Sequence, residues 1–171
     1  MRPDMFYPSA LGEGRILLLI DRFTTPKKCL EGRTKLAKLD FFLRYPSYLS
    51  KALDIIGAGP IATSETESDN IESRMIRFRY GPWDPAYFSI LGSLIGRGLV
   101  LPVKITNGIG YRTSEMGHKT AETLSLHPAW QDISDNASLL KKFLNKSGNT
   151  LRKFIYQNFQ EIVGAEMGEI I

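Results

Sequence analysis

The sequence of 171 residues contains little of what most enzymes and membrane proteins use. It has one cysteine, Cys29, and two histidines, His118 and His127. A single thiol excludes an internal disulfide, and neither histidine has a second ligand at metal-binding spacing. The longest strongly apolar run, Ile16 to Ile20, is far too short to span a bilayer, and the N-terminus lacks a secretory-type apolar core. We therefore expect a cytoplasmic protein without membrane contact, metal or cofactor.

A nucleophile with an oriented base is also missing. The sequence contains no HExxH, GxSxG or CxxC motif. Cys29 stands beside two lysines, but a nucleophilic thiol also needs a base. Asp21 and Asp40 would form a carboxylate pair only if the fold brought them together, and capping or ion-pair roles are favoured. These observations predict a protein that is not an enzyme.

Apolar side chains at helical spacing are plentiful, which predicts a mainly helical chain. Pro46 suits the first turn of a helix, and Asp84 followed by Pro85 is a typical helix start. Ser114 is a typical cap for a further helix. Helices are predicted near residues 14–23, 33–44, 46–56, 85–95 and 114–124, and two more follow Pro128.

Strand signals occur in the middle of the chain. Residues 75–80 alternate apolar and basic side chains, and residues 99–105 and 109–113 flank an Asn107-Gly108 pair. An Asn-Gly pair between two strands is the strongest local signal for a hairpin. The order of helix, strand, hairpin and helix predicts an α+β fold. It is a winged helix-turn-helix plus C-terminal helices. Its small antiparallel sheet is formed by residues near 75–80, 99–105 and 109–113, and the hairpin is its wing.

Composition divides the chain into four parts of one compact domain. Residues 1–57 form an N-terminal helical part, and residues 58–73 form an acidic mobile loop with four acidic and no basic side chains after residue 60. Residues 74–126 form the winged-helix part. Residues 127–171 form the C-terminal helices.

Positive charge is the main functional signal. The net charge of +4 is mild, but basic residues gather before and within the second helix and around the hairpin. The predicted recognition helix, residues 85–95, contains no Lys or Arg, which disfavours the reading of base sequence. We expect weak, nonspecific contact with double-stranded DNA. The candidate contacts are Lys27, Lys28, Arg33, Lys35, Lys38, Lys104, Asn107, Arg112 and Lys119.

The aromatic and C-terminal apolar residues each have two candidate roles, core packing or contact with a ligand or partner. Aromatic side chains cluster at residues 41–48 and 80–88, where core packing is favoured over stacking on bases. The segment 139–163 has an apolar side that either completes the core or docks a partner. The residues proposed for a partner interface are Trp83, Leu140, Phe143, Leu144, Leu151, Phe154, Ile155, Phe159 and Ile162.

Four blocks of sequence together resemble a known family. They are RILLLIDRF, GRTKLAKLDFFLRYP, RFRYGPWDPAYFSILGSLIGRGLV and GYRTSEMGHKTAETL. Within residues 14 to 125 they resemble the middle component of bacterial ABC-three-component systems, of which the accessory third subunit of Lamassu-type anti-phage defence is the best known. The resemblance implies a non-catalytic winged-helix subunit. It would assemble with an SMC/Rad50-like coiled-coil ATPase and an effector nuclease in an anti-phage or anti-plasmid defence complex.

Two functions of different classes therefore remain. One is an assembly subunit that helps to hold an ATPase complex on DNA. The other is a free-standing winged-helix DNA-binding transcriptional regulator. The absence of basic residues from the predicted recognition helix favours the assembly subunit.

Overall fold

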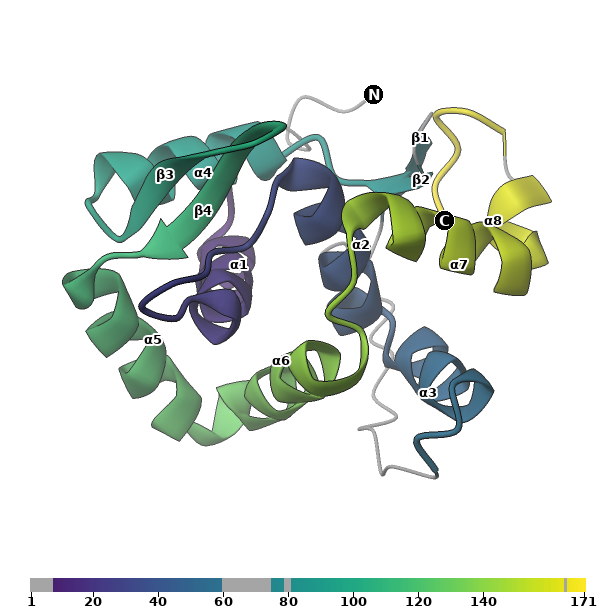
Figure 1. The fold of residues 1–171 in the computed structure, drawn as a ribbon, viewed down its shortest axis with the longest axis horizontal. Coiled ribbons are helices and arrows are strands. Elements are labelled where there is room, and N and C mark those ends of the chain that lie inside the picture. The colour runs from purple at the N-terminus through teal and green to yellow at the C-terminus, as the bar shows by residue number, and fades with distance from the viewer. Residues whose placement is uncertain (1–7, 60–74, 79–80, 165) are drawn as a thin grey trace.

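Helix α1 (Ala10–Phe23) lies in the middle of the protein, as seen in Figure 1, where other elements surround it. The computed structural model describes residues 8–59, 75–78, 81–164 and 166–171. Side chains from Ile16 to Ile20 are at most 2% exposed. Because this part of the helix is covered on all sides, its sequence lacks the polar stripe that a surface helix turns toward water. Against α1 pack α2 (Arg33–Arg44), α4 (Tyr87–Gly96), α5 (Glu115–Leu126), α6 (Gln131–Phe143) and β4 (Gly108–Thr113).

The predicted hairpin is confirmed. Strand β3 (Val100–Ile105) pairs antiparallel with β4, and the register ends with Ile105 opposite Gly108. The two-residue turn is thus Thr106 and Asn107. The positive φ falls on Gly108, at 136°, because glycine alone has no Cβ to penalise that conformation.

The predicted three-stranded sheet is wrong, although the chain is α+β and mainly helical as expected. Strand β1 (Ile76–Phe78) pairs with β2 (Gly81–Trp83) in a separate two-stranded sheet. Gly81, the first residue of β2, has a φ of 105° and lies opposite Phe78. Strand β2 therefore pairs with β1, and neither strand joins the β3–β4 hairpin.

The C-terminal helices close the core around α2, together with α3 (Pro46–Ile55). Helix α7 (Gly148–Asn158) packs on α2, and α8 (Gln160–Gly164) follows it, as the right side of Figure 1 shows. The ring of Phe159, between the two helices, lies 4.9 Å from the Tyr48 ring and 6.3 Å from the Phe42 ring. Aromatic burial of this kind contributes strongly to a core.

This packing corrects most of the predicted partner surface. Six of its nine residues are at most 3% exposed, because α2 and its neighbours already cover them. The apolar side of the C-terminal segment therefore completes the core, which was the alternative reading. The six buried residues are Leu140, Leu144, Leu151, Ile155, Phe159 and Ile162; Trp83, Phe143 and Phe154 are partly buried.

Two other expectations concern the ends and the connections of these elements. Ser114 caps α5 as predicted, since its Oγ accepts a hydrogen bond from Gly117 N at 3.0 Å. The 3-10 helix η3 (Pro128–Trp130) then leads to α6. The predicted acidic loop 58–73 lies outside the described residues except for Ala58 and Gly59. None of the helices in the described part of the chain has both the length and the apolar character needed to cross a bilayer.

Candidate nucleic-acid interface

An open groove of about 1470 Å³ lies where three distant segments meet. Its walls are the loop before α2 with the first turn of α2, the tip of the β3–β4 hairpin, and the start of α7. Most small-ligand pockets have volumes of about 300–1,000 Å³, so this groove suits an extended ligand better.

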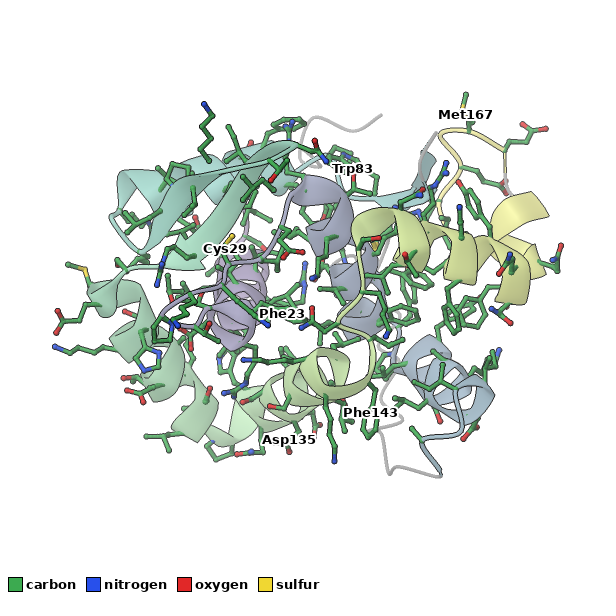
Figure 2. The ribbon with its side chains drawn as sticks, in the orientation of Figure 1. Phe23, Cys29, Trp83, Asp135, Phe143 and Met167 are labelled. Atoms are coloured by element: carbon green, nitrogen blue, oxygen red, sulfur yellow. The ribbon has the colours of Figure 1, made fainter. Side chains whose placement is uncertain are left out.

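The loop before α2 is attached to the hairpin. Leu30 N donates to Tyr111 O at 2.8 Å, and Tyr111 N donates to Leu30 O at 2.9 Å. Gly110 permits this approach, because a Cβ there would lie 2.6 Å from Cys29 Sγ. Figure 2 shows Cys29 beside the hairpin. The bridge therefore attaches the loop that carries Lys27 and Lys28 to the hairpin that carries Lys104. Cys29 packs against the hairpin at Gly110.

The first turns of two helices, α2 and α7, meet in the wall of the groove. Gly148, at the start of α7, is so close to α2 that a Cβ on it would lie 2.8 Å from Lys35 N. Helix α2 has no side-chain cap, and neither first turn contains an acidic residue. The N-terminus of a helix carries a partial positive charge, so this pair of ends adds to the positive potential of the groove.

The excess positive charge of the protein is concentrated in this groove. Six basic side chains and one acidic side chain, Glu31, line it, whereas the whole chain has a net charge of +4. Lys35 is held in the wall, since its Nζ donates to Asn145 Oδ1 at 2.8 Å and pairs with Glu31 at 3.3 Å. The basic residues are Lys27, Lys28, Arg33, Lys35, Lys104 and Arg152.

The structure brings together six of the nine DNA contacts predicted from the sequence. Five of the groove's basic residues and Asn107 belong to that set. Lys38 does not, because it is 1% exposed and donates to Pro82 O inside the core. Arg112 is half-buried and donates to Thr25 O, and Lys119 pairs with Glu115 on α5. These three residues do not line the groove.

Sequence reasoning missed the contribution of α7. Arg152, Asn149 and Ser147 line the groove, and Arg152 donates to Asn149 Oδ1 at 3.0 Å. The available signal was the run 141–153, which has five basic and no acidic residues. Nothing local in that run indicates which of its side chains face the loop before α2, more than a hundred residues earlier.

A buried ionic network fixes the other end of α2. Asp40, at 0% exposure, accepts from Arg15 Nε at 2.6 Å and from the Tyr87 hydroxyl at 2.7 Å. Arg44 pairs with Asp84 and lies 3.8 Å from Asp40. Burial, and then the Asp40 charge, raise the pKa of Tyr87 well above its usual value, so its hydroxyl stays a donor. The network joins α1, α2 and α4, and thereby orients the groove end of α2.

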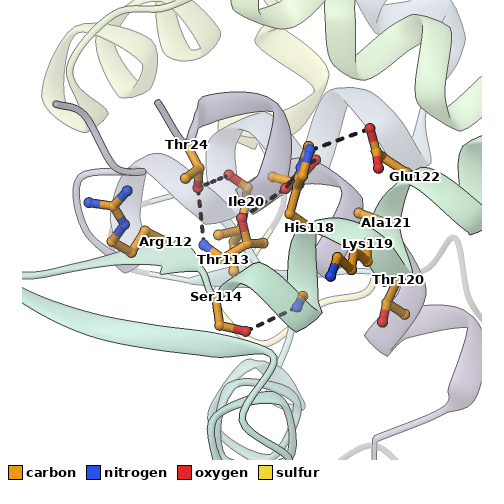
Figure 3. Close-up of polar contacts among 12 residues, drawn as sticks. Ile20, Thr24, Arg112, Thr113, Ser114, His118, Lys119, Thr120, Ala121 and Glu122 are labelled. Atoms are coloured by element: carbon orange, nitrogen blue, oxygen red, sulfur yellow. Dashed lines mark hydrogen bonds and ion pairs between the residues drawn. The ribbon is translucent and has the colours of Figure 1, made fainter. Parts of the chain in front are cut away.

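His118 lies in a second polar cluster, at the junction of α1, β4 and α5. Figure 3 shows His118 near Thr113 and Glu122. Its Nδ1 is 3.0 Å from Asp21 Oδ1, which also accepts from Thr113 Oγ1 at 2.8 Å. Its Nε2 is 3.4 Å from Glu122 Oε1. Both ring nitrogens thus face carboxylates, an arrangement that clamps α5 to α1 and does not activate a nucleophile.

A metal site or a carboxylate pair depends on how the His, Cys, Asp and Glu side chains of the described residues are grouped. In the described ranges, no three His, Cys, Asp or Glu side chains gather where they could hold a metal ion. Asp21 and Asp40 belong to separate clusters and form no carboxylate pair. Comparison of the chain with protein-family models, curated proteins and solved structures gives no match.

Proposed function

We propose that this chain is a non-catalytic subunit that binds the phosphate backbone of nucleic acid without reading base sequence. The observation that carries the proposal is the convergence of six basic side chains from three segments on one groove. Cations that neutralise phosphates supply nearly all of the affinity in nonspecific binding. The two helix ends in the wall favour the same kind of ligand.

The composition of α4 supports nonspecific contact over the regulator function. This helix precedes the hairpin, in the place of a recognition helix, and contains no Lys, Arg, Asn or Gln. Those four residue types make most direct contacts with base edges. In this proposal, α4 and the β3–β4 hairpin form a winged-helix unit whose wing carries Lys104 and Asn107 at the groove.

The sequence resemblance supplies the partners in this proposal. The subunit assembles with an SMC/Rad50-like ATPase and an effector nuclease in a bacterial defence complex, and its groove helps to hold that complex on DNA. The six buried residues of the predicted partner surface take no part in this assembly. Of that surface, Trp83, Phe143 and Phe154 remain as candidate contacts, since they are only partly buried.

A charge-reversal experiment tests the groove. Lys27, Lys28 and Lys104 are exposed groove residues, and their triple substitution by Glu should weaken duplex DNA binding at least about tenfold. The matched control replaces Lys51, Lys119 and Lys142, which are exposed and outside the groove, by Glu. Both variants change the net charge equally. Fluorescence anisotropy measures the affinity for duplex DNA. An equal loss of affinity in the two variants would contradict the proposal.

A further inference from the structure

One aromatic side chain at the edge of the groove is exposed instead of packed. Phe88, on α4, is 59% exposed, whereas the aromatic side chains that it contacts are buried or partly buried. The other described aromatic residues of its cluster are covered, as the sequence predicted: Tyr87 is buried and Trp83 is partly buried. Exposure of a phenyl ring to water is unfavourable in free energy, because the ring forgoes the stabilisation that burial in the core would give.

Phe88 is joined to the groove through Arg33. The guanidinium carbon of Arg33, a groove residue, lies 4.4 Å from the centre of the Phe88 ring. Trp83 supports the ring from another side, with ring centres 6.1 Å apart. Trp83 lies in turn against Tyr87, whose hydroxyl is anchored on Asp40. The Phe88 ring and the Arg33 guanidinium thus form a platform beside the basic groove.

We infer that the groove takes single-stranded nucleic acid, with one base stacked on the Phe88–Arg33 platform and the adjoining phosphates on the groove lysines. This inference rests on the proposed function and names its ligand more closely. Proteins that bind single strands combine a positively charged groove with aromatic side chains, and bases also stack on Arg guanidinium planes.

The lining of the groove favours a single strand over a duplex. Its cations come from separate segments, with Lys104 on the hairpin and Arg152 on α7. A single strand has a flexible backbone and unstacked bases, so its phosphates can meet cations on separate segments while one base stacks on an aromatic ring. In a duplex each base is already stacked on its neighbours, so no base face is available to Phe88. Ile109, on the hairpin wall, is 54% exposed. Its apolar side chain can contact a base but offers no charge or hydrogen bond to a phosphate.

The test compares ligands and variants by fluorescence anisotropy. The probes are oligo-dT and oligo-U of about 20 nucleotides and a mixed-sequence DNA duplex of the same length. The Phe88→Leu variant keeps an apolar side chain without a stacking face, and Phe88→Trp restores one. Leu126→Ala, at an 84% exposed position outside the groove, is the control. Circular dichroism verifies that every variant is folded.

The wild-type chain should bind the single strands more tightly than the duplex. Phe88→Leu should weaken single-strand binding about tenfold and leave duplex binding unchanged, while Phe88→Trp and Leu126→Ala stay within about twofold of wild type. The two single-strand probes distinguish DNA from RNA as the preferred strand. Duplex binding equal to or tighter than single-strand binding, or no effect of Phe88→Leu, would overturn this inference and leave the proposed function intact. Absence of binding to all three probes would overturn both.

Discussion

Both ends of helix α2 carry charged side chains, but the surroundings of the two ends differ. Its first turn presents Arg33 to the groove, whereas its last two turns bury Lys38, Asp40 and Arg44 inside the protein. Arg33 at the first end is exposed in the groove and therefore available to a ligand. Charges at the second end are neutralised by one another and by Arg15 and Asp84. A charged residue on one helix thus serves binding or stability according to what packs beside it.

The largest expected effect is at the buried end. Asp40→Asn should lower the free energy of unfolding by about 3–5 kcal/mol, because Arg15 and Arg44 would remain buried without their shared carboxylate. Urea denaturation measures this loss. Asp54→Asn, the same change at an exposed position of α3, should shift the free energy by less than about 0.5 kcal/mol. Similar losses for the two variants would show that the network does not stabilise the fold.

A smaller loss is expected where the two helix ends meet. Gly148→Ala should cost about 1–3 kcal/mol, because its Cβ would lie 2.8 Å from Lys35 N and push α7 away from α2. It should also weaken DNA binding, since Arg152 moves with α7. Gly92→Ala is the control, because nothing lies within 4 Å of that position. That variant should be neutral or more stable by up to about 1 kcal/mol, since alanine favours a helix.

Two lysines separate binding from stability. Lys27→Gln should change the free energy of unfolding by less than about 0.5 kcal/mol. It should also make the slope of the logarithm of duplex affinity against the logarithm of salt concentration less steep, by about the amount that one phosphate contact contributes. Lys38→Gln should have the reverse effect, a loss of about 1–3 kcal/mol in stability with unchanged DNA affinity, because Lys38 is buried and bonded to Pro82 O. Loss of affinity in the folded Lys38 variant would place that residue in the interface after all.

The smallest effect is expected at His118. Its hydrogen bond to Asp21, and then the charge of Asp21, raise the folded-state pKa above the usual 6.5. The stabilisation is therefore complete below pH 6.5 and is lost as the pH rises through the higher folded-state pKa. Because the side chain is 55% exposed, the effect should be below about 1 kcal/mol.

Melting temperature as a function of pH measures the contribution of His118. His118→Gln should flatten the decline just above pH 6.5, while His127→Gln, which leaves the pair with Asp21 intact, should keep it. An unchanged pH profile in the His118 variant would mean that the clamp contributes nothing to stability.

The sequence was informative wherever a structure is made by neighbours in the chain. The hairpin, the Ser114 cap and α2, which spans Arg33–Arg44 as predicted, depend on residues a few positions apart. Turn preferences, capping hydrogen bonds and helical period act over that distance. Strand β1 was wrongly assigned to the hairpin, because an alternating pattern identifies a strand but does not identify its partner.

Sequence by itself therefore determined the helices, the hairpin and the excess of positive charge, since these follow from local geometry and composition. Only the tertiary structure decided which charges are exposed and which are buried. Arg33 and Lys38 are five residues apart on one helix, yet Arg33 is exposed in the groove and Lys38 is buried beneath β2, because different segments pack beside them. The groove itself exists because Gly148 lets α7 approach α2 and because Leu30 pairs with Tyr111. These contacts join residues about eighty to more than a hundred positions apart, and no local pattern encodes them.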